Sequence, residues 1–219
     1  MLVKLKKHYH WVIAALVFLE VLVCGGLTNS LSVYVQPVST SLGVSTTSYS
    51  LALIPCTVAG FAANLLTGFL FVRFGYKKTT VASLLVLSVS TVMTAFVKDI
   101  NMFCLCRALY GFAFNICYTA GYVRIIKEWF WKHQGLILGA VSMSTGFGGS
   151  LMTILLTAVI DGGGWRMAML VTAAIVMAIM VLYFLLKDKP EQLQLKPYGY
   201  GQKTENKQKA HPQSHEWPG

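Results

Sequence analysis

Six long apolar stretches fill most of the chain between residues 11 and 186, and each is about long enough to cross a lipid bilayer. A spanning helix needs roughly 20 apolar residues, because a rise of about 1.5 Å per residue must cover a hydrocarbon core of about 30 Å. The sequence therefore predicts an all-α membrane protein with six transmembrane helices, at Trp11–Val35, Thr46–Val72, Thr79–Val97, Asn101–Val123, Gly135–Ile160 and Met167–Leu186.

The basic residues predict how such a bundle is oriented. Fifteen of the 18 Lys and Arg residues fall at the N-terminal end, in alternate connections and after residue 186. The opposite side has only Lys98 and Arg166. Because basic segments are retained on the cytoplasmic side, we expect a multi-pass protein of the plasma (cytoplasmic, inner) membrane with both termini in the cytoplasm. The net charge of +10 is then an insertion signal spread over four segments, and we expect no nucleic-acid partner.

The chain divides into three regions by composition. Residues 1–10 are expected to be a cytoplasmic N-terminus, residues 11–186 a six-helix transmembrane bundle, and residues 187–219 a cytoplasmic tail. The tail is rich in Lys, Gln, Pro and Gly and poor in aliphatic residues, which predicts disorder. All five cysteines lie within spans, where they are expected to pack as small apolar residues. We expect neither a cofactor nor a metal site.

The two halves of the predicted bundle are similar in sequence. The segment Gly60–Thr67 in the second span resembles Gly146–Thr153 in the fifth. The same offset aligns two pairs in the first and fourth spans, Gly25 with Gly111 and Asn29 with Asn115. Three spans is an odd number, so a second three-helix unit enters the membrane inverted, which is how many secondary transporters are built. The alternative is chance similarity, because membrane helices use few residue types.

The connection between the second and third spans carries a motif. It reads Gly68-Phe-Leu-Phe-Val72-Arg73-Phe74-Gly75-Tyr76-Lys77-Lys78 and resembles the signature loop of the major facilitator superfamily. That loop has Gly, three residues, Asp, a basic residue, any residue, Gly and further basic residues. The resemblance implies a gating loop formed by Gly68, Arg73, Gly75, Lys77 and Lys78. Val72 stands where the family has the Asp that helps to lock two halves together, and a generic basic turn is the alternative interpretation.

Later spans add to this resemblance. Arg107-Ala-Leu-Tyr-Gly111 resembles the family's fourth-helix pattern of an Arg followed four residues later by Gly. The fifth span is glycine-rich, as in the family. The expected helix-packing glycines are Gly111 of the fourth span and, in the fifth, Gly139, Gly146, Gly148 and Gly149. Gly164-Trp165-Arg166 and Glu128-Trp129-Phe130 resemble the branch that holds oxalate/formate antiporters and monocarboxylate transporters. The resemblance implies symport or antiport of a small organic anion, a monocarboxylate or dicarboxylate, by alternating access.

The resemblance also implies a missing partner. Full members of the family have twelve spans in two bundles, so this chain resembles the N-terminal half of a secondary active transporter. The expected partners are the lipid bilayer, a small-molecule substrate and a second six-helix bundle, which is either a C-terminal half or a second copy. The alternative is a truncated or accessory six-helix membrane protein without transport activity on its own. An enzyme is not expected, since no nucleophile motif, paired acids or intramembrane His-rich cluster occurs.

Two ionisable residues lie well inside the predicted spans, Glu20 in the first and Arg107 in the fourth. Such residues cost roughly 2.5–3.5 kcal/mol on insertion scales, so their presence needs a reason. We expect an axial offset of about 10 Å between them and a cavity-facing ion pair whose breaking is linked to proton or anion binding. A permanent structural pair is the alternative. Three more candidates for substrate binding or coupling are polar residues that could line an outward vestibule or join helices by hydrogen bonds: Asn29, Asn115 and Tyr118.

Overall fold

The computed structural model describes residues 2–119, 121–130 and 133–185, and the regular elements in this part are all helical. Five helical stretches are long and apolar enough to cross a membrane. The predicted tail at residues 187–219 lies outside the described residues. The elements, in chain order, are α1 (Leu2–Asn29), η1 (Ser30–Tyr34), α2 (Val35–Leu42), α3 (Thr46–Leu51), α4 (Ile54–Phe74), α5 (Tyr76–Ala95), α6 (Ile100–Phe114), η2 (Asn115–Thr119), α7 (Gly121–Trp129) and α8 (Gln134–Leu185).

The first membrane-length stretch joins α1, η1 and α2 and continues past its predicted end at Val35 to Leu42. A short 3₁₀ segment, η1, tightens the chain before α2. The stretch stops at Gly43, which has φ 64° and caps α2 in the left-handed conformation that glycine adopts without strain. Ser45 then caps α3, because its side chain accepts a hydrogen bond of 3.1 Å from the backbone N–H of Ser48.

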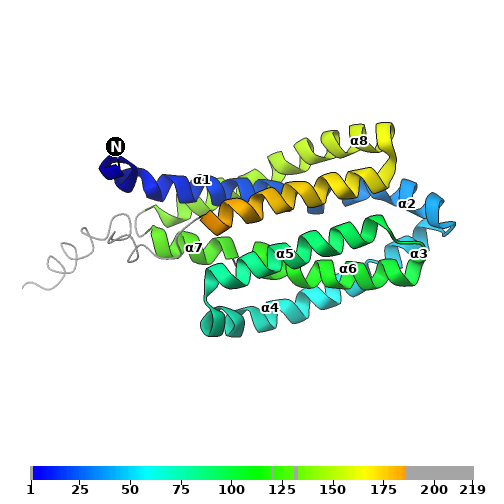
Figure 1. The fold of residues 1–219 in the computed structure, drawn as a ribbon, viewed down its shortest axis with the longest axis horizontal. Helices are drawn as coiled ribbons and strands as arrows, with labels where there is room; N and C mark the ends of the chain where they lie inside the picture. Colours follow the sequence, from blue (N-terminus) through cyan, green and yellow to red (C-terminus); the bar gives the residue numbers. More distant parts are fainter. Residues whose placement is uncertain (1, 120, 131–132, 186–219) are drawn as a thin grey trace, which may run out of the picture.

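The longest helical element, α8, turns back on itself at Gly164 (Figure 1). The φ of Gly164 is 78° and its ψ is 170°, a combination that is open almost only to glycine. Gly75, between α4 and α5, has a similar φ of 82° and ψ of 154°. We call Gln134–Gly163 the first arm of α8 and Trp165–Leu185 the second arm. The two arms correspond to the two separate predicted spans at Gly135–Ile160 and Met167–Leu186.

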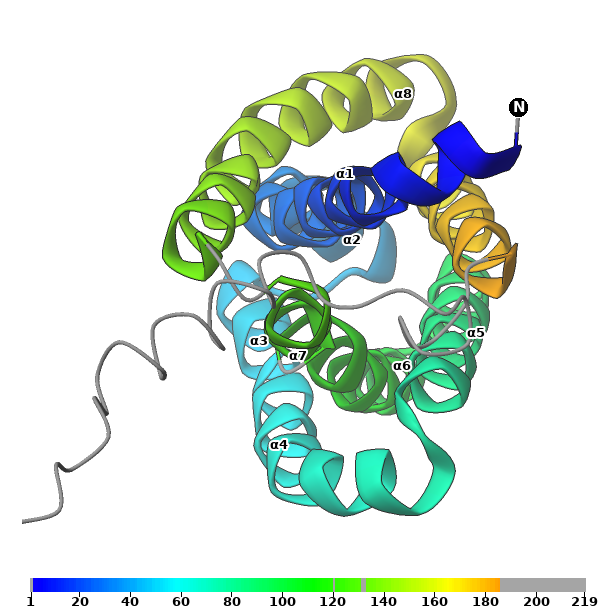
Figure 2. The same cartoon turned by 90° about the vertical axis from the view of Figure 1, so that its left-hand side faces the viewer.

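The long helices lie roughly along one axis, with α1 between the two arms of α8 (Figures 1 and 2). The helix α6 packs against both α4 and α5, and α5 continues the bundle by packing against α8. Figure 1 shows that the α4–α5 turn and α7 lie at one end of the bundle. The α2–α3 connection, the α5–α6 connection and the turn of α8 lie at the other end.

Two helix pairs approach so closely that only glycine fits between them. A Cβ on Gly148 in α8 would lie 1.9 Å from the carbonyl oxygen of Leu22 in α1. A Cβ on Gly111 in α6 would lie 2.1 Å from the carbonyl oxygen of Cys56 in α4. These glycines therefore allow backbone-to-backbone contact, which is the main source of helix association where the solvent is as apolar as the side chains.

The other predicted packing glycines behave differently from one another. Gly149 lies next to Asn29, whose amide nitrogen would be 3.0 Å from an added Cβ. Gly139 and Gly146 are exposed, and no atom of the described residues lies within 4 Å of a Cβ built on either. The expectation that these two pack against another helix is wrong for this bundle. The reason is angular, since two residues rotate a helix by about 200° and so place Gly146 and Gly148 on opposite faces.

Candidate functional site

The two intramembrane charges predicted from the sequence are both almost completely buried. Glu20 on α1 has no exposed surface, and Arg107 on α6 is 3 % exposed. A buried charge is expensive unless charged or hydrogen-bonding partners surround it. The environment of each residue therefore decides what it can do.

Glu20 belongs to a polar cluster formed by α1, α5 and the second arm of α8. The hydroxyl of Tyr183 donates a hydrogen bond to Oε2 of Glu20. Tyr76 and Thr80 of α5 stand next to this pair. Three buried oxygens of the cluster have no hydrogen-bond partner among the described residues: Oε1 of Glu20, the hydroxyl of Tyr76 and Oγ1 of Thr80. Unpaired buried polar atoms in one place mark a site that can hold water or a proton.

Arg107 has a different environment, made of rings, a thioether and hydroxyls. Its Nη2 lies 3.9 Å from the sulfur of Met169. Its guanidinium carbon is 5.2 Å from the ring centroid of Phe103 and 5.1 Å from that of Tyr110, within the range of cation–π attraction. Its Nε is buried and has no hydrogen-bond partner within the described part of the chain. None of these contacting groups carries a negative charge.

A small cavity of about 10 Å³ opens beside the guanidinium of Arg107, enough for about one water molecule. Its lining combines apolar side chains with hydroxyl groups from α5, η1 and α8, and the hydroxyls of Tyr34 and Thr172 are 3.4 Å apart. The three threonine hydroxyls of this lining donate to backbone carbonyls of their own helices, so the guanidinium is the group beside the space that can attract an anionic oxygen. The lining residues are Leu27, Leu31, Tyr34, Thr91, Thr94, Arg107, Tyr110, Met169 and Thr172.

The expected ion pair between Glu20 and Arg107 is absent from the described structure, because the two side chains contact different levels of the bundle. Glu20 bonds to Tyr183, whereas Arg107 contacts Met169 on the same arm of α8. These two α8 residues are 14 positions apart, which is about 21 Å along a helix. The sequence analysis expected an axial offset of only about 10 Å between Glu20 and Arg107, and so it allowed a direct ion pair. The separation of their partners on α8 shows that this offset was underestimated.

The three remaining polar candidates join helices in this structure. The amide nitrogen of Asn29 donates to the carbonyl oxygen of Thr145, and the hydroxyl groups of Tyr118 and Thr145 are 3.1 Å apart. Asn29 and Tyr118 therefore both contact Thr145 on the first arm of α8. Asn115 donates to the carbonyl oxygen of Gly111 and accepts from the amide of Asn64 at 3.2 Å. This bonding matches the simpler alternative for these residues, hydrogen bonds between helices.

The predicted gating loop forms the α4–α5 turn, with Gly75 at its corner. The guanidinium of Arg73 lies 5.8 Å from the ring centroids of Phe69 and Phe74. The ammonium of Lys77 lies 5.6 Å from the ring centroid of Phe184. Aromatic faces thus hold two of the loop cations at the end of the bundle.

Sequence reasoning missed the cluster partners of Glu20. Tyr183 follows Glu20 by 163 residues and lies in an apolar run, and Tyr76 and Thr80 begin a helix next to a basic turn. Each looks like an ordinary residue near the end of a span. No local pattern in the sequence indicates that the three side chains meet.

The fold and site define a polytopic helical membrane protein with buried charges inside its bundle. The sequence model of the Major Facilitator Superfamily matches residues 16–210, and the chain belongs to that family. The family and the five membrane-length helical stretches indicate a multi-pass membrane protein.

Individual relatives agree with this assignment. A protein of Cupriavidus necator named as probable sulfoacetate transporter SauU is 23 % identical over 165 residues, covering 74 % of this chain and 38 % of that protein. The proton:xylose symporter XylE, bound to 6-bromo-6-deoxy-D-glucose, superimposes with a TM-score of 0.71 at 18 % identity, covering 86 % of this chain and 47 % of XylE. A partially occluded inward-open structure of the E. coli xylose transporter XylE gives a TM-score of 0.70 at 16 % identity, over 84 % and 51 % of the two chains. The chain thus spans about half or less of the length of these relatives.

Proposed function

We propose that this chain forms one bundle of a secondary active transporter for small organic anions, monocarboxylates or dicarboxylates, that works by alternating access. The observation that carries the proposal is the buried guanidinium of Arg107, which contacts no anionic group among the described side chains. A cation kept in a dry site without a counter-charge costs stability, and a bound substrate carboxylate would offset that cost. The adjacent cavity of about 10 Å³ would have to widen to admit the substrate, with the guanidinium as its main anchor.

One comparison and one sequence resemblance support an anionic substrate class. SauU is named for sulfoacetate, a small organic anion, and it shares 23 % identity with this chain. The resemblance of Gly164-Trp165-Arg166 to the oxalate/formate antiporter and monocarboxylate transporter branch agrees with it. XylE is named for xylose, an uncharged sugar, but at 18 % identity the likeness concerns the fold.

The architecture we propose is six spans in two inverted three-helix repeats. The two arms of α8 supply the fifth and sixth spans. Gly75 aligns with Gly164 once three residues are inserted into the second sequence repeat, and both glycines have positive φ and reverse the chain. Gly25 and Gly111 also match, and a Cβ on either would lie within 3 Å of a facing helix.

A second six-helix bundle would complete the transporter, with residues 187–219 as its connecting tail. Large apolar side chains of α4 and of the first arm of α8 are exposed on this bundle, among them Phe61 at 68 % and Phe147 at 68 %. Lipid or another bundle has to cover such faces. Gly68, Arg73, Gly75, Lys77 and Lys78 would then form the gate at the end of the bundle that also carries α7.

We assign proton coupling to the cluster around Glu20. Its carboxyl group has one oxygen bonded to Tyr183, and the other oxygen has no partner among the residues that the structure describes. The group can therefore bind or release a proton without losing all of its contacts. In an active transporter, Glu20→Gln should flatten the pH dependence of uptake while substrate binding persists. An unchanged pH profile would remove the proton role and leave a structural one.

The proposed location is the plasma membrane with both termini in the cytoplasm. The basic connections at the α4–α5 turn and at α7 lie at one end of the bundle (Figure 1), as the retention of cations in the cytoplasm requires. Reporter fusions in the α2–α3 connection and after residue 219 test this orientation. A periplasmic signal from the C-terminal fusion would overturn it.

Ligand-induced stabilisation tests the substrate class directly. The purified chain is heated in detergent with oxalate, lactate, sulfoacetate or xylose. An anion present at about 100 times its dissociation constant should raise the thermal midpoint by about 5–10 °C. Stabilisation by xylose and by none of the acids would refute the proposed substrate class.

The substitution Arg107→Met tests whether Arg107 binds a substrate anion or only stabilises the packing of the bundle. Methionine has a similar reach but no charge, so the ligand-free variant should be as stable as the wild type or more stable, and the anion-induced shift should vanish. Arg124→Met, which removes an exposed cation lying over Phe71, is the matched control and should keep the shift. A destabilised Arg107→Met variant that still responds to the anion would assign Arg107 a packing role instead.

A further inference from the structure

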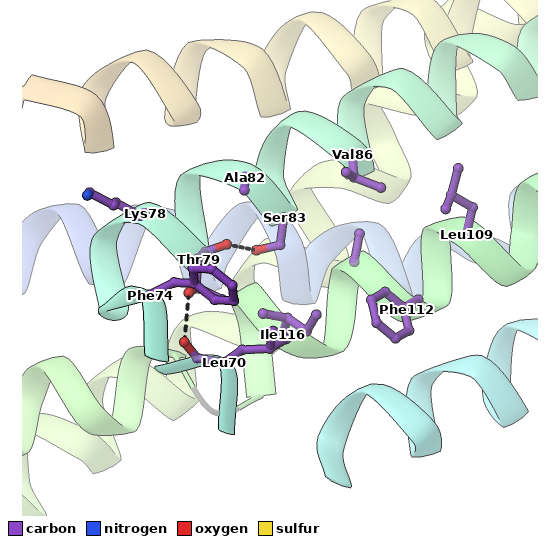
Figure 3. A pocket seen from close by; sticks show the side chains of 11 residues that line it. Leu70, Phe74, Lys78, Thr79, Ala82, Ser83, Val86, Leu109, Phe112 and Ile116 are labelled. Carbon is purple, nitrogen blue, oxygen red and sulfur yellow. Dashed lines mark hydrogen bonds between the residues drawn. The ribbon is translucent and has the colours of Figure 1, made fainter. Parts of the chain in front are cut away.

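A long apolar cleft lies on the outside of the bundle, away from Glu20 and Arg107. Its volume is about 490 Å³, which is in the range of small-molecule sites. The cleft runs between the end of α4, the first half of α5 and α6 (Figure 3). Its lining residues are Leu70, Phe74, Lys78, Thr79, Ala82, Ser83, Val86, Leu109, Phe112, Ala113 and Ile116.

Carbon atoms form almost the whole lining. Two hydroxyl residues line the cleft, but both bond to their own surroundings: Thr79 donates to the carbonyl oxygen of Gly75 at 2.9 Å, and Ser83 to that of Thr79 at 2.9 Å. Neither hydroxyl is available as the main anchor of a polar ligand. The cleft therefore suits a hydrocarbon chain.

One end of the cleft is cationic. Figure 3 shows Lys78 at one end of the row of lining side chains and Leu109 with Phe112 at the other. The side chain of Lys78 is exposed, at the beginning of α5 and beside the basic α4–α5 turn. A ligand in the cleft would thus place its polar end at the surface of the bundle and its apolar end inside the membrane.

The dimensions match one leaflet of a bilayer. The α5 residues that line the cleft run from Lys78 to Val86, which is about 12 Å along the helix. One leaflet contributes about half of a hydrocarbon core of about 30 Å. A lipid chain that enters from the headgroup level beside Lys78 would lie along the cleft for most of that depth.

From this geometry we propose that the cleft binds one acyl chain of an anionic phospholipid, with the lipid phosphate held by Lys78. The positive charge of Lys78 favours a headgroup with net negative charge, and the apolar walls hold the chain. The site is separate from the proposed substrate site at Arg107. Its existence does not depend on transport, so each proposal can fail without the other.

Native mass spectrometry of the delipidated full chain tests the site with two lipids, palmitoyl-oleoyl phosphatidylglycerol and palmitoyl-oleoyl phosphatidylcholine. Their acyl chains are identical, and their headgroups differ in net charge because the choline cation of phosphatidylcholine neutralises its phosphate. We expect the first phosphatidylglycerol to bind about fivefold more tightly, which is the value of one cation near an anionic lipid. Lys78→Gln should remove this preference, whereas Lys98→Gln, at the other end of the bundle, should keep it. A preference that survives Lys78→Gln would overturn the headgroup assignment.

Filling the cleft tests the acyl chain separately. Ala82→Trp places an indole between the walls and should lower the binding of both lipids severalfold. Ala62→Trp, at an exposed position of α4 outside the cleft, is the matched control. If Ala82→Trp fails to fold, Leu109→Trp on the opposite wall replaces it. Unchanged lipid binding in the folded cleft variants would refute the proposal, and a change in oligomer mass instead would assign the cleft to a protein partner.

Discussion

Replacement of Gly148 by alanine should force α1 away from the first arm of α8. The new Cβ would lie 1.9 Å from the carbonyl oxygen of Leu22, whereas ordinary contact begins at 3.4 Å, so the backbones must separate by about 1.5 Å. Overpacking costs typically 1–3 kcal/mol, and the upper part of that range applies because a backbone atom cannot rotate aside. The better helix propensity of alanine increases the free energy of unfolding by about 0.5–1 kcal/mol and so offsets part of this cost. The net loss of about 2 kcal/mol should lower the thermal midpoint by about 4–8 °C.

Gly146→Ala is the matched control for this experiment. It lies on the same arm of α8, and no atom of the described residues comes within 4 Å of its added Cβ. Only the propensity gain applies, so the thermal midpoint should rise by about 1–4 °C. Both midpoints are measured in one detergent by intrinsic fluorescence, with size-exclusion chromatography before and after heating. Equal midpoints for the two variants would refute the close approach of α1 and α8.

Three further predictions use the same thermal assay. Tyr183→Phe removes the donor to Glu20 and should cost about 1–3 kcal/mol, since a buried carboxyl group loses its partner; no loss would mean that water replaces the hydroxyl. Gly164→Ala should cost about 1–3 kcal/mol, because φ is 78° there, whereas Gly162→Ala on the helical side of the turn should not destabilise. Asn29→Ala should cost about 0.5–1.5 kcal/mol by loss of its hydrogen bond to Thr145, and an unchanged midpoint would mean that this bond does not stabilise the bundle.

The helices themselves could be predicted from the sequence because their signals are local. Apolar runs of membrane length mark the stretches that the structure forms, and the signature-like loop at Gly68–Lys78 predicted the family that the comparison found. The boundaries were less accurate. The first stretch continues to Leu42, because α2 follows η1 without leaving the helical region and ends only at Gly43.

The residues of the candidate site could be named from the sequence, but their partners could not. A charge within an apolar run is conspicuous, so Glu20 and Arg107 were identified as candidates. Which side chain faces each of them depends on the rotation and axial register of three helices. An error of a few residues in register moves a contact by 5 Å or so, enough to exchange one partner for another.

Composition and the spacing of apolar and basic residues therefore determined the class of this protein, a helical membrane protein. The resemblance of the Gly68–Lys78 loop indicated its family, the Major Facilitator Superfamily. Burial in a bilayer requires long apolar helices whatever their arrangement, so the sequence carries that information directly. The tertiary structure alone decided that Glu20 meets Tyr183, that Arg107 contacts Met169 and that Gly148, not Gly146, packs on α1. These contacts join positions far apart in the chain, and close packing of whole helices selects them.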